Sequence, residues 1–412
     1  MNTTKIESPR ITKLYEDVKI NKEESLQAFW SEIAKKGAPL IEEIEGDDEN
    51  YLVTLLWRET EPIDNVSVIG EMFGMDPDIA KLEKLIGTDL WYRTWKVNGG
   101  ARSLYVFVFN IEDDQDWGSF DFILDPLNPR KYVCVTDDKK PNRCYLLSKE
   151  ESYIALNDFK ECIWSIERED TPKGKVELFD EFKSNVLNNK RRVWMYTPAG
   201  YNKNSEPYGL AIFTDGWEYA YVTKTITILD NLINEGKIPA MCVVFIETDE
   251  ERDTELTCSD KFGEFIMNEI LPWVYMNYNV TRDPQKNLIG GFSYGGLTAS
   301  FLGLKYPDIF QKVLCQSGGM SWTSENDGNK RGKILEMYEN ADKLPLDFYI
   351  TFGEFEKPYE GHYNATKEFV NILEEKGYKF KYKEFMGGHN NPDLDMELAN
   401  GFKFLLGNND SI

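Results

Sequence analysis

Hydrophobic and polar positions follow two different periods along the chain. Residues 22–36 place apolar side chains three and four positions apart and are followed by Gly37 and Pro39, which predicts one amphipathic helix. Between residues 51 and 132, short runs rich in β-branched and aromatic residues lie between turn-forming clusters. These runs are 51–57, 66–69, 90–95 and 104–109. Short strands spaced in this way predict a β-sandwich.

The pattern changes after residues 156–176, a segment that we expect to be a linker because it is polar and contains Pro172 and Gly174. Strand-like runs then alternate with helical patterns. The runs are 193–196, 210–213, 241–246, 287–290, 312–315, 348–352 and 380–385, and the helical patterns lie near 223–236, 260–277, 295–305, 363–376 and 393–406. This alternation predicts a mostly parallel sheet with helices on both faces and a site at the carboxyl ends of its strands.

We therefore expect a β-sandwich domain over residues 1–155, the linker over 156–176 and an α/β domain over 177–412. The chain carries 71 acidic against 47 basic residues, a net charge of −24. Such a field repels phosphate backbones and anionic lipid, so we expect neither nucleic acid nor a membrane as a partner. The sequence indicates no oligomeric state.

Cysteine and histidine usage limits the chemistry. The six cysteines form no Cys-x-x-Cys pair and the first ten residues are polar, so we expect reduced thiols and a cytoplasmic protein. The two histidines, His362 and His389, are too few for a histidine-rich metal cluster. We expect no metal ligands and no cofactor, and an imidazole base has to be one of these two residues.

The sequence Gly291-Phe292-Ser293-Tyr294-Gly295 lies between a predicted strand and a predicted helix. Gly-x-Ser-x-Gly in this position is typical of the tight turn that presents a nucleophilic serine in α/β-hydrolases. The turn exposes Ser293 Oγ at the sheet edge and directs the backbone N–H of Tyr294 toward a developing oxyanion. We expect Ser293 to be the nucleophile of an α/β-hydrolase domain.

The same fold orders its catalytic groups as serine, acid and histidine along the chain. His389 follows the last predicted strand and is the expected base, whereas His362 is expected to be a surface residue at a helix start. The acid has to follow the strand 348–352, where Glu356 is the expected residue. Glu354 and a serine–histidine dyad without an acid remain alternatives.

A second oxyanion donor is expected in the loop after the strand 210–213, which reads Thr214-Asp215-Gly216-Trp217. The backbone N–H of Trp217 is the expected donor. The N–H of Gly216 and an ordinary turn are the alternatives.

Motifs in both predicted domains resemble those of one family. They are Phe29-Trp30, the segments 37–40, 54–58, 89–94, 125–129, 192–198, 215–217, 252–256, 269–273, 316–318 and 387–389, and the serine turn. The chain resembles the enterochelin (enterobactin) esterases of the Fes and IroD type. The resemblance implies an immunoglobulin-like β-sandwich followed by an α/β-hydrolase domain. It also implies a serine esterase that cuts the trilactone backbone of ferric catecholate siderophores, with iron entering as part of the substrate.

A ferric catecholate is an anion, so this substrate requires local cations. Arg252 follows the strand 241–246 and is expected to pair with catecholate oxygens, with neutralisation of Glu251 and Asp253 as the alternative. Trp322 is expected to stack on a catechol ring, with buried packing as the alternative. Two other functions remain: a carbohydrate-linked or feruloyl ester hydrolase of the same fold, and a siderophore-binding protein without turnover.

Overall fold

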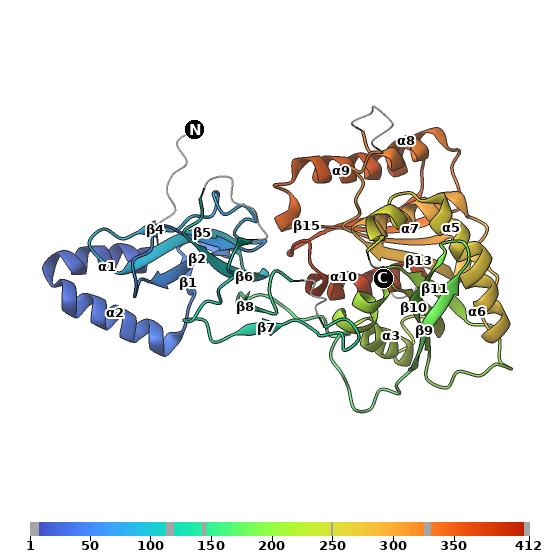
Figure 1. Cartoon of the computed structure of the whole chain (residues 1–412), viewed down its shortest axis with the longest axis horizontal. Coiled ribbons are helices and arrows are strands. Elements are labelled where there is room, and N and C mark those ends of the chain that lie inside the picture. The colour runs from blue at the N-terminus through green and yellow to red at the C-terminus, as the bar shows by residue number, and fades with distance from the viewer. Residues whose placement is uncertain (1–7, 113–118, 142–145, 249, 325–330, 408–412) are drawn as a thin grey trace. The chain divides into compact units, whose positions relative to one another are not determined.

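The computed structural model describes residues 8–112, 119–141, 146–248, 250–324 and 331–407. The chain forms two compact units, shown in Figure 1. The first comprises Met1–Lys160 and Met386–Gly388, and the second comprises Glu161–Phe385 and His389–Ile412. The division after Lys160 lies inside the segment 156–176. That segment differs from the expected linker, because Trp164 and Thr171 are buried and Asn231 Nδ2 donates to the carbonyl oxygen of Trp164.

Two helices open the first unit, where one was expected. Helix α2 (Lys22–Lys36) has the predicted bounds and ends at Gly37, whose φ of 84° favours glycine. Helix α1 (Pro9–Ile20) was not predicted. Its start carries a recognisable signal, because Ser8 Oγ accepts from the Ile11 N–H at 3.1 Å and Pro9 occupies the first turn.

Two antiparallel four-stranded sheets complete this unit. Their orders are β1-β2-β5-β4 and β3-β6-β8-β7. The strands are β1 (Leu40–Ile44), β2 (Asp47–Arg58), β3 (Val66–Ile69), β4 (Glu83–Lys84), β5 (Leu90–Asn98), β6 (Arg102–Phe109), β7 (Lys131–Val133) and β8 (Glu150–Ala155). The sheets pack through aromatic rings, as in the 5.4 Å contact between Trp57 and Phe107. The β-rich character of this unit is confirmed, and its immunoglobulin-like topology stays a prediction.

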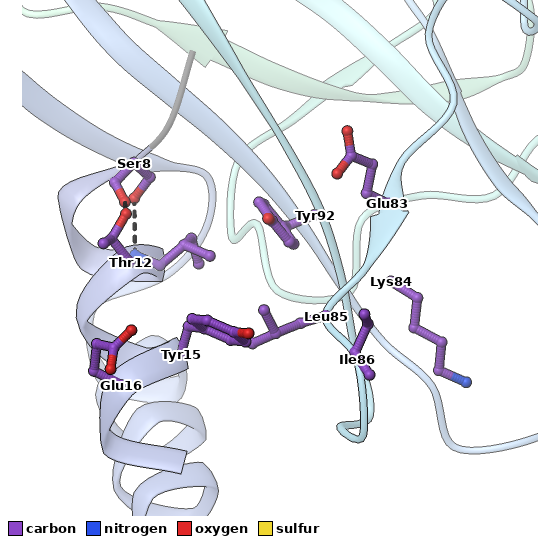
Figure 2. Close-up of a pocket in the computed structure, with 10 residues that line it drawn as sticks. Ser8, Thr12, Tyr15, Glu16, Glu83, Lys84, Leu85, Ile86 and Tyr92 are labelled. Atoms are coloured by element: carbon purple, nitrogen blue, oxygen red, sulfur yellow. Dashed lines mark hydrogen bonds between the residues drawn. The ribbon is translucent and has the colours of Figure 1, made fainter. Parts of the chain in front are cut away.

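A pocket of about 410 Å³ lies between α1 and the β4–β5 region (Figure 2). Thr12 and Tyr15 line it from α1, and Leu85 and Tyr92 line it from the other side. None of the predicted catalytic or binding residues lines this pocket. The predicted catalytic and binding residues all belong to the second unit.

A buried carboxyl group joins the strands of the first unit. The Tyr105 hydroxyl donates to Asp125 Oδ2 at 2.7 Å, and the Leu127 N–H donates to Asp125 Oδ1 at 2.8 Å. Asp125 is only 2% exposed, and this burial raises the pKa of its carboxyl group from 3.8 to about 6. The motif at 125–129 thus has a structural role in the first unit.

We predict that Asp125 makes the folded chain less stable as the pH rises through 6. Because its pKa is higher in the folded chain, its stabilising contribution is complete below pH 3.8 and is lost above about pH 6. The change corresponds to roughly 3 kcal/mol. Urea unfolding of the wild type and Asp125→Asn at pH 4.5 and 7.5 measures about 2 kcal/mol of it, because the rest of the change lies below pH 4.5. Identical pH dependence in the two proteins would contradict the assignment.

The second unit is built on an eight-stranded sheet in the order β16-β15-β14-β13-β11-β12-β10-β9. The strands are β9 (Lys175–Ser184), β10 (Asn189–Thr197), β11 (Gly209–Phe213), β12 (Met241–Ile246), β13 (Asn287–Phe292), β14 (Lys312–Gln316), β15 (Asp347–Gly353) and β16 (Lys379–Phe385). The β11–β16 strands pair in parallel, and β10 is antiparallel to both β9 and β12. The predicted mostly parallel sheet is confirmed, whereas β9 was not predicted.

Alternating side chains of the central strands point to opposite faces of the sheet. Ile212, Val244 and Ile289 belong to one large core cluster, which also contains residues of the helical region 262–274. On the other face Phe213 contacts Phe402 of α10, with ring centroids 6.0 Å apart. Figure 1 shows α10 beside α3, which it also contacts. Both faces are therefore covered, which explains why the strands read as continuous apolar runs.

The helices of this unit largely match the predicted patterns. They are α3 (Thr225–Asn234), α4 (Arg252–Glu255), α5 (Asp260–Phe265), α6 (Leu271–Asn277), α7 (Tyr294–Lys305), α8 (Lys333–Asn340), α9 (Glu360–Glu375) and α10 (Asp395–Leu406). Helices α4 and α8 were not predicted, and a π-helical turn at Ile266–Ile270 separates α5 from α6. Across the described residues, every helix is too short or too polar to cross a membrane.

Candidate active site

Ser293 lies at the junction of β13 and α7, in the strained turn that the motif predicts. Its backbone has φ 58° and ψ −123°, a conformation that non-glycine residues rarely adopt. The Ser293 N–H donates to the Gln316 carbonyl oxygen at 3.0 Å, and its own carbonyl oxygen accepts from Gly319 N–H at 3.0 Å. The segment after β14 therefore holds the strained turn in place.

The glycines around Ser293 are needed for close packing. A Cβ on Gly291 would overlap the backbone of Gly295. A Cβ on Gly295 would lie 2.5 Å from Thr214 Oγ1, so the loop after β11 lies directly against the first turn of α7. The structure thus brings the two segments expected to form the oxyanion hole into contact.

His389 follows β16 and lies beside the serine turn. Its ring centroid is 4.4 Å from that of Phe292, the residue that precedes Ser293. The His389 side chain is 39% exposed, which leaves it accessible to a ligand. Ser293 Oγ makes no hydrogen bond to any other residue in the described part of the chain. Proton transfer between them requires a closer approach than this conformation has, as is common in enzymes without substrate.

Glu356 is held by three hydrogen bonds from three segments. His389 Nδ1 lies 2.6 Å from Glu356 Oε2. The other carboxylate oxygen, Oε1, accepts from Ser317 Oγ at 2.6 Å and from the Gly353 N–H at 2.8 Å. The Glu356 side chain is 5% exposed, so these bonds are shielded from water. Glu356 thus orients the imidazole of His389 as the acidic member of a serine–histidine–acid triad does.

Ser317 contacts the candidate acid Glu356, a contact that the sequence did not predict. It has a φ of 42° and lies at the end of β14, 39 residues before Glu356. The sequence signal for Ser317 was its place in Gln316-Ser317-Gly318, one of the motifs that resemble those of the enterochelin esterases. Its hydrogen bond to Glu356, however, depends on the pairing of β14 with β15.

The alternatives for the acid and the base lie apart from this arrangement. The Glu354 carboxylate forms an ion pair with Lys357 at 2.7 Å, and the structure gives it no hydrogen bond to His389. His362 is exposed in the first turn of α9, as predicted, and its Nδ1 lies 2.7 Å from Ser321 Oγ. The geometry therefore favours Glu356 over Glu354 as the partner of His389.

The two candidate oxyanion donors occupy the starts of helical segments. Tyr294 is the first residue of α7, so its N–H has no acceptor within the helix. Trp217 is buried and directly precedes the π-helical turn η2 (Glu218–Val222). Backbone N–H groups at such positions stabilise developing negative charge.

Arg252 has a partner that the sequence did not predict. Its guanidinium Nε and Nη2 bind the carboxylate of Asp215 at 2.7 and 2.9 Å, and Thr248 Oγ1 also donates to Asp215. The alternative considered from the sequence, Asp253, lies 3.9 Å from the guanidinium in a pair that is largely exposed. Asp215 is 7% exposed and belongs to the predicted oxyanion loop. The geometry therefore favours a role in holding this loop over recognition of an anion.

Trp322 is partly buried and packs against the core of the second unit. Its carbonyl oxygen accepts from the Lys333 N–H at 2.9 Å, and Lys333 Nζ lies 5.8 Å from its ring centroid. Its packing role is thus visible in the structure, and stacking on a catechol stays a prediction.

Comparison with known proteins identifies the family. The model of the family described as putative esterase matches residues 184–405, more than half of the chain. The chain belongs to this esterase family. It is a carboxylic-ester hydrolase with an α/β-hydrolase domain, as the sequence predicted.

Two comparisons extend over both units. The iron(III) enterobactin esterase of Dickeya dadantii is 24% identical, over 93% of this chain and 94% of the relative. The crystal structure of ferric enterobactin esterase from Salmonella typhimurium has a TM-score of 0.72 at 23% identity and covers 92% of this chain and 98% of its own. A further iron(III) enterobactin esterase, from Escherichia coli, is 26% identical over 72% of this chain and 76% of its own. The predicted resemblance to the enterochelin esterases is confirmed.

We predict that Glu356→Gln lowers kcat for p-nitrophenyl butyrate by a factor on the order of 10²–10⁴, because a neutral amide does not stabilise the imidazolium of His389. Ser317→Ala removes one bond to the same carboxylate and lowers kcat about fivefold. Steady-state kinetics measure both changes, and circular dichroism checks the fold. Glu354→Gln is the matched control and keeps wild-type activity. Full activity of Glu356→Gln would leave a serine–histidine dyad.

We also predict that Arg252→Ala slows hydrolysis of the uncharged p-nitrophenyl butyrate about tenfold, because it leaves the buried Asp215 carboxylate without its strongest partner. Arg252→Lys restores part of the rate. The control is Asp253→Asn, which removes only an 82% exposed carboxylate. Unchanged hydrolysis of this ester by Arg252→Ala would instead support the anion-binding role predicted from the sequence.

Proposed function

We propose that the chain hydrolyses the trilactone backbone of ferric catecholate siderophores such as enterobactin and bacillibactin, so that iron is released from the products. The observation that carries the substrate class is the extent of the similarity to iron(III) enterobactin esterases, which spans both units. The candidate active site supplies the groups that ester hydrolysis requires. Iron belongs to the substrate in this proposal, and the chemistry at Ser293 uses no resident metal or cofactor.

In the proposed mechanism Ser293 Oγ attacks a seryl-ester carbonyl while His389 Nε2 accepts the serine proton. Glu356 holds the opposite nitrogen, Nδ1, and stabilises the imidazolium. The N–H groups of Tyr294 and Trp217 bind the oxyanion of the tetrahedral intermediate. When the C–O bond of the ester breaks, His389 protonates the leaving alkoxide. A water molecule, activated by the same imidazole, then attacks the acyl-enzyme and regenerates Ser293.

We place this activity in the cytoplasm. The five cysteines in the described part of the chain are free thiols, which supports a reducing compartment, and Cys144 lies outside that part. The net charge of −24 supports the view that the protein binds neither nucleic acid nor anionic lipid. An anionic substrate then depends on a few favourable groups at the site, among which Trp322 is a candidate for stacking on a catechol.

The test is mass spectrometry of the products after incubation with iron-loaded enterobactin, bacillibactin and a feruloyl sugar ester. We predict linear catechoyl-serine products that gain one water per ester cleaved. Ser293→Ala and His389→Ala each lower kcat by a factor of about 10³ or more. The exposed Ser205→Ala is the control for the nucleophile. Hydrolysis of the iron-free trilactone continues in EDTA.

Other outcomes identify the alternatives. Cleavage of the feruloyl ester alone indicates a carbohydrate-linked ester hydrolase, and binding of the siderophore without products indicates a binding protein. Loss of activity in EDTA that zinc restores would contradict the metal-independent mechanism.

A further inference from the structure

The histidine that the proposed mechanism does not use lies at the same edge of the sheet as the catalytic groups. His362 is in the first turn of α9, and this helix begins four residues after Glu356. The segment that follows β14 reaches this turn, because His362 Nδ1 lies 2.7 Å from Ser321 Oγ. The same segment also donates from Ser317 to Glu356 and from Gly319 to the Ser293 carbonyl oxygen. One loop thus connects Ser293, Glu356 and His362.

The electrostatics also indicate that the two imidazoles are neighbours. The side chain of His362 is exposed, but the surrounding atoms exclude enough water to lower the pKa of its imidazole. The His389 imidazole lowers this pKa further, and the Glu356 carboxylate acts in the opposite direction. Charges act on one another in this way only over short distances in water. These directions agree with the geometry, in which the segment after β14 contacts Glu356 through Ser317 and His362 through Ser321.

The hydrogen bond to Ser321 determines what the ring offers to a ligand. The two nitrogens of imidazole point outward in different directions, and in the neutral form one donates while the other accepts. When the Ser321 hydroxyl donates to Nδ1, the proton of the ring is on Nε2. An exposed, oriented N–H donor then remains beside the ester-cleaving groups.

Two cationic side chains near this edge are already paired. Arg252 binds the Asp215 carboxylate through two nitrogens, and Lys357 forms ion pairs with Glu354 at 2.7 Å and Glu384 at 2.6 Å. An iron-bound catecholate has oxygens that only accept hydrogen bonds, so it requires donors. His362 has no carboxylate partner among the described residues, and in the tautomer with its proton on Nε2 it is such a donor.

We propose that His362, oriented by Ser321, is a substrate-binding residue whose Nε2–H donates to a catecholate oxygen of the siderophore while Ser293 attacks the ester. This inference rests on the proposed function and adds a residue that contacts the substrate. The Ser321–His362 pair contributes to recognition of the substrate and not to the proton transfers.

Binding is measured on the Ser293→Ala background, where the substrate is not consumed. The Kd for iron-loaded enterobactin is measured by quenching of tryptophan fluorescence. We expect His362→Ala to raise this Kd about tenfold, which is typical for the loss of a hydrogen bond to a charged group. In enzyme with Ser293 intact, the same substitution raises KM more than it lowers kcat. His362→Gln retains an N–H donor and recovers most of the affinity. Asn364→Ala, an exposed residue on the same helix, is the control and keeps the Kd of the background.

Ser321→Ala tests the orientation of the ring. It raises the Kd in the same direction by a smaller factor, and the double variant binds no more weakly than His362→Ala because the two residues act as one unit. An unchanged Kd in His362→Ala, or a fall in kcat without a change in KM, overturns the inference while the proposed function stands. A wild-type protein that neither binds nor cleaves the siderophore overturns both.

Discussion

The carboxylate of Glu356 connects the segments on which the candidate active site depends. Its Oε1 accepts from Ser317 at the end of β14 and from the Gly353 N–H at the end of β15, and its Oε2 binds His389 after β16. A buried carboxylate without partners is costly, so these donors and the turn that carries Glu356 stabilise one another. The imidazole receives its orientation from a group that is itself fixed on both oxygens.

Backbone strain is concentrated at the same edge of the sheet. Asp215, Ser293 and Ser317 follow β11, β13 and β14, and all three have φ values between 42° and 58°. Such conformations cost on the order of 1–3 kcal/mol each and persist only where neighbouring groups determine them. The neighbours are visible here: the Ser317 N–H donates to the Thr351 carbonyl oxygen, and the Asp215 carbonyl oxygen accepts from the Tyr219 N–H, both at 3.0 Å. Contacts with the sheet thus hold the turns after β11, β13 and β14 in conformations that these segments would not adopt in isolation.

Paired charges fix the loop that carries Arg252. Arg191 and Arg192 on β10 bind Glu255 and Glu247 in two buried ion pairs, and Glu255 is the last residue of α4. Arg252 begins the same short helix and binds Asp215 across to the oxyanion loop. In an acid-rich chain these arginines neutralise particular buried carboxylates, because an unpaired one would destabilise the fold. Recognition of an anionic substrate then depends on other donors.

The sequence by itself determined the class of fold, most of the strands of the second unit and the tight turn at Ser293, and it predicted His389 rather than His362 as the base. These features depend on local patterns: apolar runs that fill a doubly covered sheet, and glycines that permit one tight turn. It favoured Glu356 but kept Glu354 as an alternative, because both lie in the same turn and only the folded turn directs one of them toward His389. It predicted that Arg252 binds a ligand. The actual partner, Asp215, lies 37 residues away in sequence, so no local pattern indicates the pair. Only the tertiary structure decided these pairings, since they form between strand ends that the sheet brings together.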